Sequence, residues 1–181
     1  MTPKEFYSTY LADDNLSELS DALIATVMQF NPVHVLDFGG GTGKHCKALE
    51  KHGVEAWNMD LSQLNIVHSL FGNKVPVSVC GDETRLRHLC NFDVVMTCSV
   101  LDHIQDVEPI LREFQRIANK AVVLAETQDL IGEFYFANGY EELGFQKTDY
   151  KWLSPHDGAL YKIFIWRRPD KKINPADDDL G

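Results

Sequence analysis

The chain has 181 residues, and its 27 acidic against 17 basic side chains give a formal net charge of −10 at pH 7. With 44% hydrophobic and 24% charged residues it has the material for one domain with a full core, which excludes general disorder. The acidic balance disfavours a nucleic-acid partner, because binding to phosphates depends on cationic side chains. No apolar run approaches the roughly 18 to 20 residues of a membrane span, and the first ten residues lack the basic-then-apolar pattern expected of a secretory signal. We expect a cytoplasmic protein without a membrane partner.

Two helices are predicted in the first 31 residues, as an N-terminal cap. Thr2 and Glu5 fit a capping box with proline between them, and Asn15 with Glu18 repeats the pattern before apolar residues at helical spacing. An Asn-Pro pair ends the second helix. The four cysteines follow neither a C-x-x-C metal pattern nor a disulfide framework, so we expect reduced thiols and no metal.

Short β-rich runs then alternate with helical stretches. The predicted strands are residues 33–38, 55–60, 75–80, 92–97 and 121–126. Helices are predicted at about 44–51, at 62–71, at 83–89 and after Asp106. Such alternation indicates a parallel sheet that is covered by helices on both faces.

The pattern changes after the fifth predicted strand. A helix is predicted to end at Gly144, and the runs 146–154 and 159–168 are predicted to pair as an antiparallel hairpin. The expected fold is therefore α/β, with a seven-stranded, mostly parallel sheet, an antiparallel C-terminal hairpin and helices on both faces. We expect a single domain over residues 1–168 and a mobile acidic tail over 169–181.

A glycine-rich loop, Asp37-Phe38-Gly39-Gly40-Gly41-Thr42-Gly43, follows the first predicted strand and precedes a helix. Such a loop lets a ligand approach the N–H groups at a helix N-terminus. A P-loop would need Ser or Thr after Lys44, where His45 stands, so ATP is disfavoured. The dinucleotide fingerprint would need glycine at Lys44, so a nicotinamide cofactor has little support.

An acidic residue two positions before GxGxG resembles the signature of the class I S-adenosylmethionine-dependent methyltransferases. The segments NMDLS and CGDE resemble the ribose-binding and adenine-binding segments of that family, and FDVVMTCSVLDHI is similar to its fourth strand and following loop. The resemblance spans residues 33–168 and implies S-adenosylmethionine as the cofactor. The cofactor-binding residues that it implies are Asp37, Gly39, Gly40, Gly41, Gly43, Asp60, Leu61, Asp82, Glu83, Cys98 and Ser99.

The carboxylates at the strand ends suit an adenosine ligand on chemical grounds. Asp60 could accept from the ribose hydroxyls, Asp82 from the adenine amine, and Asp37 could position the cationic methionine end. The alternative is that each of these acids caps the helix that follows it. Three acids at three successive strand ends, together with the glycine loop, favour the cofactor site.

The loop after the fourth predicted strand contains the catalytic candidates, His103 and Asp102. Methyl transfer requires donor and acceptor in line, and it requires a base only when the nucleophile carries a proton that must leave. A histidine suits proton removal, and the alternative is that His103 caps a helix or is a hydrogen-bonded structural residue. We expect aromatic side chains near this loop to select the acceptor. The alternative is that these side chains only pack in the core. These are Phe6, Tyr7, Tyr10, Phe134, Tyr135 and Phe136.

The predicted function is in-line transfer of a methyl group from S-adenosylmethionine to a small-molecule acceptor. The loop after the fourth strand lacks the Asn- or Asp-Pro-Pro-aromatic tetrad of enzymes that methylate exocyclic nitrogens of nucleic acids, and Cys98 lacks the preceding proline of cytosine methyltransferases. Asp102 has no evident second acid for a metal-assisted site. Two alternatives stay open: a protein or nucleic-acid methyltransferase, and a non-catalytic relative that binds S-adenosylmethionine as a partner module.

Overall fold

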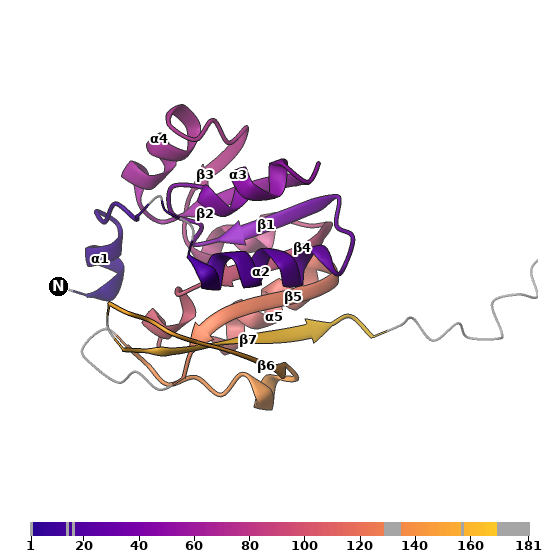
Figure 1. Cartoon of the computed structure of the whole chain (residues 1–181). Coiled ribbons are helices and arrows are strands. Elements are labelled where there is room, and N and C mark those ends of the chain that lie inside the picture. Colours follow the sequence, from indigo (N-terminus) through magenta and orange to yellow (C-terminus); the bar gives the residue numbers. More distant parts are fainter. Residues whose placement is uncertain (1, 14, 16, 129–134, 157, 170–181) are drawn as a thin grey trace, which may run out of the picture.

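The computed structural model describes the chain except for residues 1, 14, 16, 129–134, 157 and 170–181 (Figure 1). The predicted tail at 169–181 lies almost entirely outside the described residues, and so does Phe134 of the predicted aromatic segment.

Seven strands of the described chain form one sheet. They are β1 (His34–Phe38), β2 (Glu55–Asp60), β3 (Val77–Cys80), β4 (Phe92–Cys98), β5 (Ala118–Thr127), β6 (Gln146–Leu153) and β7 (Leu160–Arg167). The strand order is β3-β2-β1-β4-β5-β7-β6. The first five strands pair in parallel, whereas β7 pairs antiparallel with both β5 and β6. The predicted fold class is confirmed, including the C-terminal hairpin.

Helices cover both faces of the sheet (Figure 1). They are α1 (Pro3–Tyr7), α2 (Glu18–Met28), α3 (Lys44–Glu50), α4 (Gln63–Phe71) and α5 (Glu108–Ile117), with 3-10 turns η1 (Glu83–His88), η2 (Leu101–His103) and η3 (Glu141–Leu143). Successive strand residues point to opposite faces, so Val94 and Met96 join the core beneath α2 and α3, and Val95 joins the core beneath α5. Burial on both faces explains why β4 and β5 are almost continuously apolar.

Three of the predicted local structures are wrong. The N-cap of α2 is Ser17, whose Oγ accepts from the Ser20 N–H at 3.2 Å, whereas Asn15 donates to the Asp13 carboxylate. The predicted helix before Gly144 is, in its described part, only the turn η3, and the predicted helix at 83–89 is the 3-10 turn η1. A hydroxyl two residues closer to the first buried leucine satisfies the free N–H groups of α2 in place of the amide.

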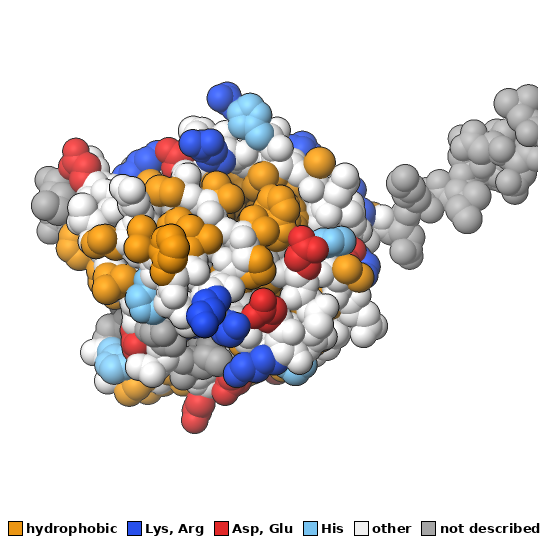
Figure 2. All heavy atoms as spheres, turned by 90° about the horizontal axis from the view of Figure 1, so that it is seen from above, with side chains coloured by type: hydrophobic (Ala, Val, Ile, Leu, Met, Phe, Trp, Pro, Cys, Tyr) orange, Lys and Arg blue, Asp and Glu red, His pale blue; other side chains and the backbone are white. Residues whose placement is uncertain are grey.

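The helix α4 has an unusual distribution of polar and apolar side chains. Its buried face carries Asn65 and Ser69 beside Ile66, and these polar groups face the carboxyl ends of neighbouring strands. Figure 2 shows hydrophobic side chains gathered on the surface that includes the outer face of α4. The exposed apolar residues of this helix are Leu64, Val67, Leu70 and Phe71. The inward polar face therefore serves a polar site rather than the core.

Candidate functional site

The predicted site residues meet at the edge formed by the carboxyl ends of the parallel strands. β1 lies between β2 and β4 in the sheet, and the connections of β1 leave toward opposite sides of it. A reversal of strand order of this kind opens a crevice at the carboxyl edge, which is where α/β proteins bind ligands. Asp37, Asp60 and Cys98 come from the ends of three adjacent strands there. Motifs that are far apart in the sequence thus lie close together in the structure.

The glycine loop has a backbone that other residues adopt only with strain. Gly39, Gly41 and Gly43 have φ angles of 71°, 56° and 81°, in the left-handed region. Gly40 is required for another reason, because a Cβ there would overlap the side-chain oxygens of Asn58 and Asp37. The loop therefore lies directly on two buried polar side chains at the ends of β1 and β2.

Asp37 is fully buried beneath this loop. Its Oδ2 lies 3.3 Å from Nδ1 of His45, and Nε2 of His45 lies 3.1 Å from Oγ of Ser20. The arrangement resembles the Ser-His-Asp triad of hydrolases, but Ser20 is only 1% exposed, so no substrate reaches its hydroxyl. Sequence reasoning missed His45 as a partner of Asp37, because the pair lies across the start of α3.

Two buried oxygens beneath the glycine loop have no hydrogen-bond partner among the described residues, Oδ1 of Asp37 and Oδ1 of Asn58. The amide nitrogen of Asn58 is used, since it donates to the Gly41 carbonyl at 2.9 Å and to Ser69 Oγ at 3.0 Å. Buried acceptors are normally satisfied, so two unsatisfied ones beneath the same loop indicate a place for a ligand with N–H donors. Asn58 was not predicted from the sequence.

Asp60 at the end of β2 is bound to the glycine loop. Its Oδ2 accepts from the Gly41 N–H at 2.9 Å, and its Oδ1 accepts from Ser62 N–H at 2.7 Å and from Asn65 Nδ2 at 3.0 Å. Burial nevertheless raises the pKa of Asp60, because desolvation outweighs these hydrogen bonds. The carboxylate is held in one orientation at the edge of the crevice, beside Leu61.

Asp82 after β3 is engaged in a different way. Its Oδ1 accepts from the Thr84 N–H at 3.0 Å and so caps η1, and its Oδ2 lies 2.7 Å from Nζ of Lys4. The hydrogen bond from Lys4, followed by those from Thr84, lowers the pKa of Asp82 to about 2. Glu83 also lies 3.3 Å from Lys4. The capping alternative of the sequence analysis is what this structure shows for Asp82.

The loop after β4 begins with Cys98 and Ser99. Burial raises the pKa of the Cys98 thiol, with the nearby carboxylate of Glu126 as the next cause. Ser99 has a φ angle of 55°, and its Oγ lies 2.9 Å from the hydroxyl of Tyr161 on β7. A left-handed serine turns the chain sharply at the strand end, toward the glycine loop.

His103 lies within a cluster of polar and aromatic groups from separate parts of the chain. Its Nδ1 is 3.2 Å from the hydroxyl of Tyr7 on α1, and its Nε2 is 3.5 Å from Oδ1 of the buried Asp102. The ring centroids of Tyr7 and Tyr135 lie 4.4 Å and 4.8 Å from that of the imidazole. Burial raises the pKa of Tyr7, and Tyr135 and Asp102 add to the effect. The structure brings together both catalytic candidates and two of the predicted aromatic residues.

The other predicted aromatic residues are more peripheral. Phe6 and Tyr10 on the N-terminal segment are 39% and 45% exposed, which suits a surface that a ligand could contact. Phe136 is half-buried, and its N–H donates to the Asp102 carbonyl at 2.7 Å, so the segment after β5 is joined to the loop that carries His103.

Glu126 is a buried carboxylate that the sequence analysis did not include in the site. It lies at the end of β5, and it accepts hydrogen bonds from Thr97 and from the backbone of Val100 and Leu101. Burial raises the pKa of Glu126 well above its usual range, and the nearby Asp102 raises it further. An acid at the end of an otherwise apolar strand was the signal that could have identified it.

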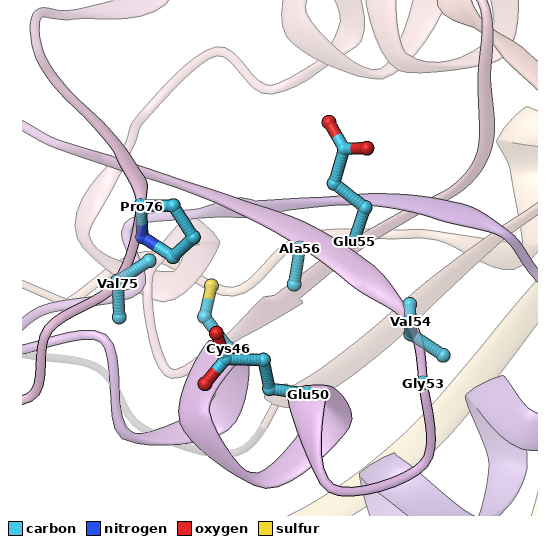
Figure 3. A pocket seen from close by; sticks show the side chains of 8 residues that line it. All are labelled: Cys46, Glu50, Gly53, Val54, Glu55, Ala56, Val75 and Pro76. Carbon is cyan, nitrogen blue, oxygen red and sulfur yellow. The ribbon is translucent and has the colours of Figure 1, made fainter.

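A hollow of about 300 Å³ lies elsewhere, at the amino ends of β2 and β3 (Figure 3). Its lining residues are Cys46, Glu50, Gly53, Val54, Glu55, Ala56, Val75 and Pro76. Mostly apolar walls with two acidic side chains offer little for an adenosine ligand, and none of the predicted site residues lies there. We therefore place the candidate site at the carboxyl edge.

A family model described as a methyltransferase domain matches residues 5–159, which is most of the chain. The chain belongs to this family and, with its Rossmann-like sheet and glycine loop, to the class I S-adenosylmethionine-dependent methyltransferases. The family predicted from the sequence motifs is confirmed.

Several solved structures share the fold at low sequence identity. Magnesium protoporphyrin IX methyltransferase from Synechocystis PCC 6803, solved with bound SAH, has a TM-score of 0.69 at 12% identity, covering 87% of this chain and 90% of that one. TehB from Haemophilus influenzae has a TM-score of 0.69 at 15% identity, covering 82% of this chain and 62% of that one. The PH0226 protein from Pyrococcus horikoshii OT3 has a TM-score of 0.66 at 17% identity, covering 91% and 99%. Comparison with curated proteins finds no match.

Among the residues that the structure describes, no helix combines the length and the apolar character needed to pass through a membrane. Within the same residues, no three His, Cys, Asp or Glu side chains form a group that could hold a metal ion. The four cysteines are free thiols, as predicted.

Proposed function

We propose that the protein transfers a methyl group from S-adenosylmethionine to a small-molecule acceptor, with His103 as the base. The observation that carries this proposal is the arrangement at the carboxyl edge of the sheet. There the glycine loop, with buried acceptors beneath it, lies beside the cluster of Tyr7, Asp102 and His103.

The residues at this edge fit the cofactor. Oδ1 of Asp37 and Oδ1 of Asn58 are buried acceptors suited to the methionine ammonium group, and Asp60 would accept from the ribose hydroxyls. Leu61, Glu83, Cys98 and Ser99, with the four glycines, would complete the cofactor-binding set. When bound, S-adenosylmethionine supplies an electrophilic methyl group on its sulfonium sulfur. Asp82 would accept from the adenine amine, in competition with Lys4, which already holds one of its oxygens.

His103 has the geometry of a base that is oriented from one side. Asp102 lies beside Nε2 and would stabilise the imidazolium that forms when His103 takes up a proton. Nδ1 faces the Tyr7 hydroxyl, so an acceptor with a hydroxyl, thiol or amine group would take that position or replace the contact. The aromatic rings of Tyr7 and Tyr135 next to the imidazole would help to exclude water from the proton transfer.

Short segments around the site favour a small acceptor. The residues near His103 come from α1, η2 and the segment after β5, and the chain carries a net charge of −10, which disfavours a nucleic-acid acceptor. Free cysteines suit the reducing conditions of the cytoplasm. We propose that the protein acts there.

The test uses methyl-labelled S-adenosylmethionine and a cell extract separated by size into small-molecule and macromolecular fractions. The proposal expects label in the small-molecule fraction with the wild type and a strong decrease with His103→Ala. Label confined to protein or nucleic acid would contradict the acceptor class. Binding of the cofactor without transfer to any fraction would support the non-catalytic alternative.

A further inference from the structure

The carboxyl group of Glu126 lies buried beneath the loop that follows β4. Its Oε1 accepts from Thr97 Oγ1 at 3.1 Å, and the N–H of Val100 donates to both carboxylate oxygens, at 3.2 Å and 3.0 Å. The N–H of Leu101 donates to Oε2 at 3.1 Å. In each of these contacts Glu126 accepts, so its two carboxyl oxygens together satisfy all three donors.

The loop that Glu126 holds has contacts at both of its ends. On one side, the Val100 side chain packs against Gly39, so closely that a Cβ at Gly39 would overlap it. On the other side, the loop continues through Asp102 to His103, whose ring contacts those of Tyr7 and Tyr135. One buried side chain therefore holds a segment that touches both the glycine loop and the candidate base.

The groups that face Glu126 come from four neighbouring parts of the chain. They are Asp102 of η2, Tyr140 before η3, Thr97 and Cys98 of β4, and Lys162, which lies opposite Glu126 on β7. The hydrogen bonds from Thr97 and from the two backbone N–H groups offset part of the cost of burying the carboxyl group and hold it in one orientation.

We infer that Glu126 is a positioning residue for the proposed reaction. It fixes the loop of Val100 to His103 so that the imidazole and the glycine loop keep one relative position, and it does not itself touch the reacting groups. The inference rests on the proposed function, because positioning His103 matters only if His103 takes part in the reaction. That Glu126 holds the loop is a separate structural claim, which can be tested without an acceptor. Glutamine would not replace Glu126, because its NH2 group would face the N–H of Val100 or Leu101, donor against donor.

The test compares Glu126→Gln with the matched control Glu142→Gln, which removes an exposed carboxylate in η3. Two properties are measured: the Cε1–H resonance of His103 by NMR, assigned with His103→Gln, and the affinity for S-adenosylhomocysteine by calorimetry. We expect Glu126→Gln to shift the His103 resonance, because the aromatic rings around it move relative to the imidazole, and to weaken the affinity roughly tenfold. The control should change neither. Unchanged His103 resonance and affinity in a folded Glu126→Gln variant would overturn the inference.

A second measurement keeps the inference testable if Glu126→Gln does not fold. In the wild type, the amide protons of Val100 and Leu101 should exchange with solvent as slowly as those of β4 and β5, because Glu126 holds them. Exchange as fast as in exposed loops would overturn the inference. Failure of the wild type to bind S-adenosylhomocysteine would count against the proposed function alone, since the exchange rates and the His103 resonance still report on Glu126.

Discussion

Asp60 supports the glycine loop and also offers its carboxylate to a ligand. We expect Asp60→Ala to weaken binding of S-adenosylhomocysteine by one to two orders of magnitude, because hydrogen bonds to a charged group contribute about 1.5 to 3 kcal/mol. The variant should remain folded, since the side chain lies at a strand end outside the core. Calorimetry measures the affinity, and Asp149→Ala on the exposed side of β6 is the control. Equal affinities for the wild type and a folded Asp60→Ala would place the ribose contact elsewhere.

Substitution of His103 should affect turnover much more than cofactor affinity. His103→Ala should lower turnover by roughly 10² to 10⁴ and leave the affinity for S-adenosylhomocysteine nearly unchanged, because the imidazole acts on the acceptor. Tyr7→Phe keeps the ring beside His103 and removes only the hydroxyl, so its effect on turnover should be smaller. Steady-state rates of the wild type and of both variants are measured with the acceptor that the labelling experiment identifies. A modest decrease in His103→Ala would mean that proximity alone drives the transfer.

At the scale of elements, α1 is anchored by the ion pair of Lys4 with Asp82. Because the pKa of Asp82 is lowered to about 2, the folded protein binds fewer protons there than the unfolded chain, whose Asp has a pKa of about 3.9. This contribution to stability is present above about pH 4 and is lost as the pH falls toward 2. Lys4→Met should therefore reduce the free energy of unfolding at pH 7 by at most about 1 kcal/mol, since the pair is partly exposed.

Urea unfolding of the wild type and Lys4→Met at pH 7 and at pH 3 measures this difference. The gap between the two proteins should narrow at the lower pH, while Lys51→Met, which removes an exposed lysine of the C-cap of α3, should show no such narrowing. A gap of constant size would show that Lys4 stabilises the protein through packing rather than through Asp82.

The central strands β1, β4 and β5 could be predicted with near-correct bounds because they contain apolar runs, buried on both faces, that end at polar residues. The short turns could not be predicted in the same way. The segment Glu83–His88 was predicted as a helix, but it has only six residues with one of them buried, and it forms a 3-10 turn. At α2, several polar residues compete for the capping position, and the position of the first buried leucine, Leu19, decides in favour of Ser17.

At the scale of the whole molecule, the sequence was enough to predict that the site lies at the carboxyl edge of the sheet. It was not enough to predict which side chains contact one another there. Parallel strands place their carboxyl ends together, so the motif residues had to meet. The contacts of Tyr7 with His103 and of His45 with Asp37 depend on how α1 and α3 pack, which no spacing in the chain encodes. Glu126 was missed for the same reason, since its partners come from the end of β4.

Cofactor binding should stabilise the whole domain. At 100 times its dissociation constant, S-adenosylmethionine or S-adenosylhomocysteine should add about 2.7 kcal/mol to the free energy of unfolding. NAD and ATP should add nothing, because the glycine loop has neither of their sequence patterns. Thermal shift assays with the four compounds make the comparison. Stabilisation by NAD or ATP without stabilisation by the adenosyl compounds would contradict the cofactor assignment.

The N-terminal segment contacts three separate parts of the site. Lys4 meets Asp82, Tyr7 meets His103, and Ala12 lies against Gly41 while its N–H donates to Asn65. A ligand seated on the glycine loop is thus covered by a segment that also forms one wall around His103. We expect a compulsory order of binding, in which the methyl donor enters first and its demethylated product leaves last. Product inhibition by S-adenosylhomocysteine should then be competitive with the donor and noncompetitive with the acceptor.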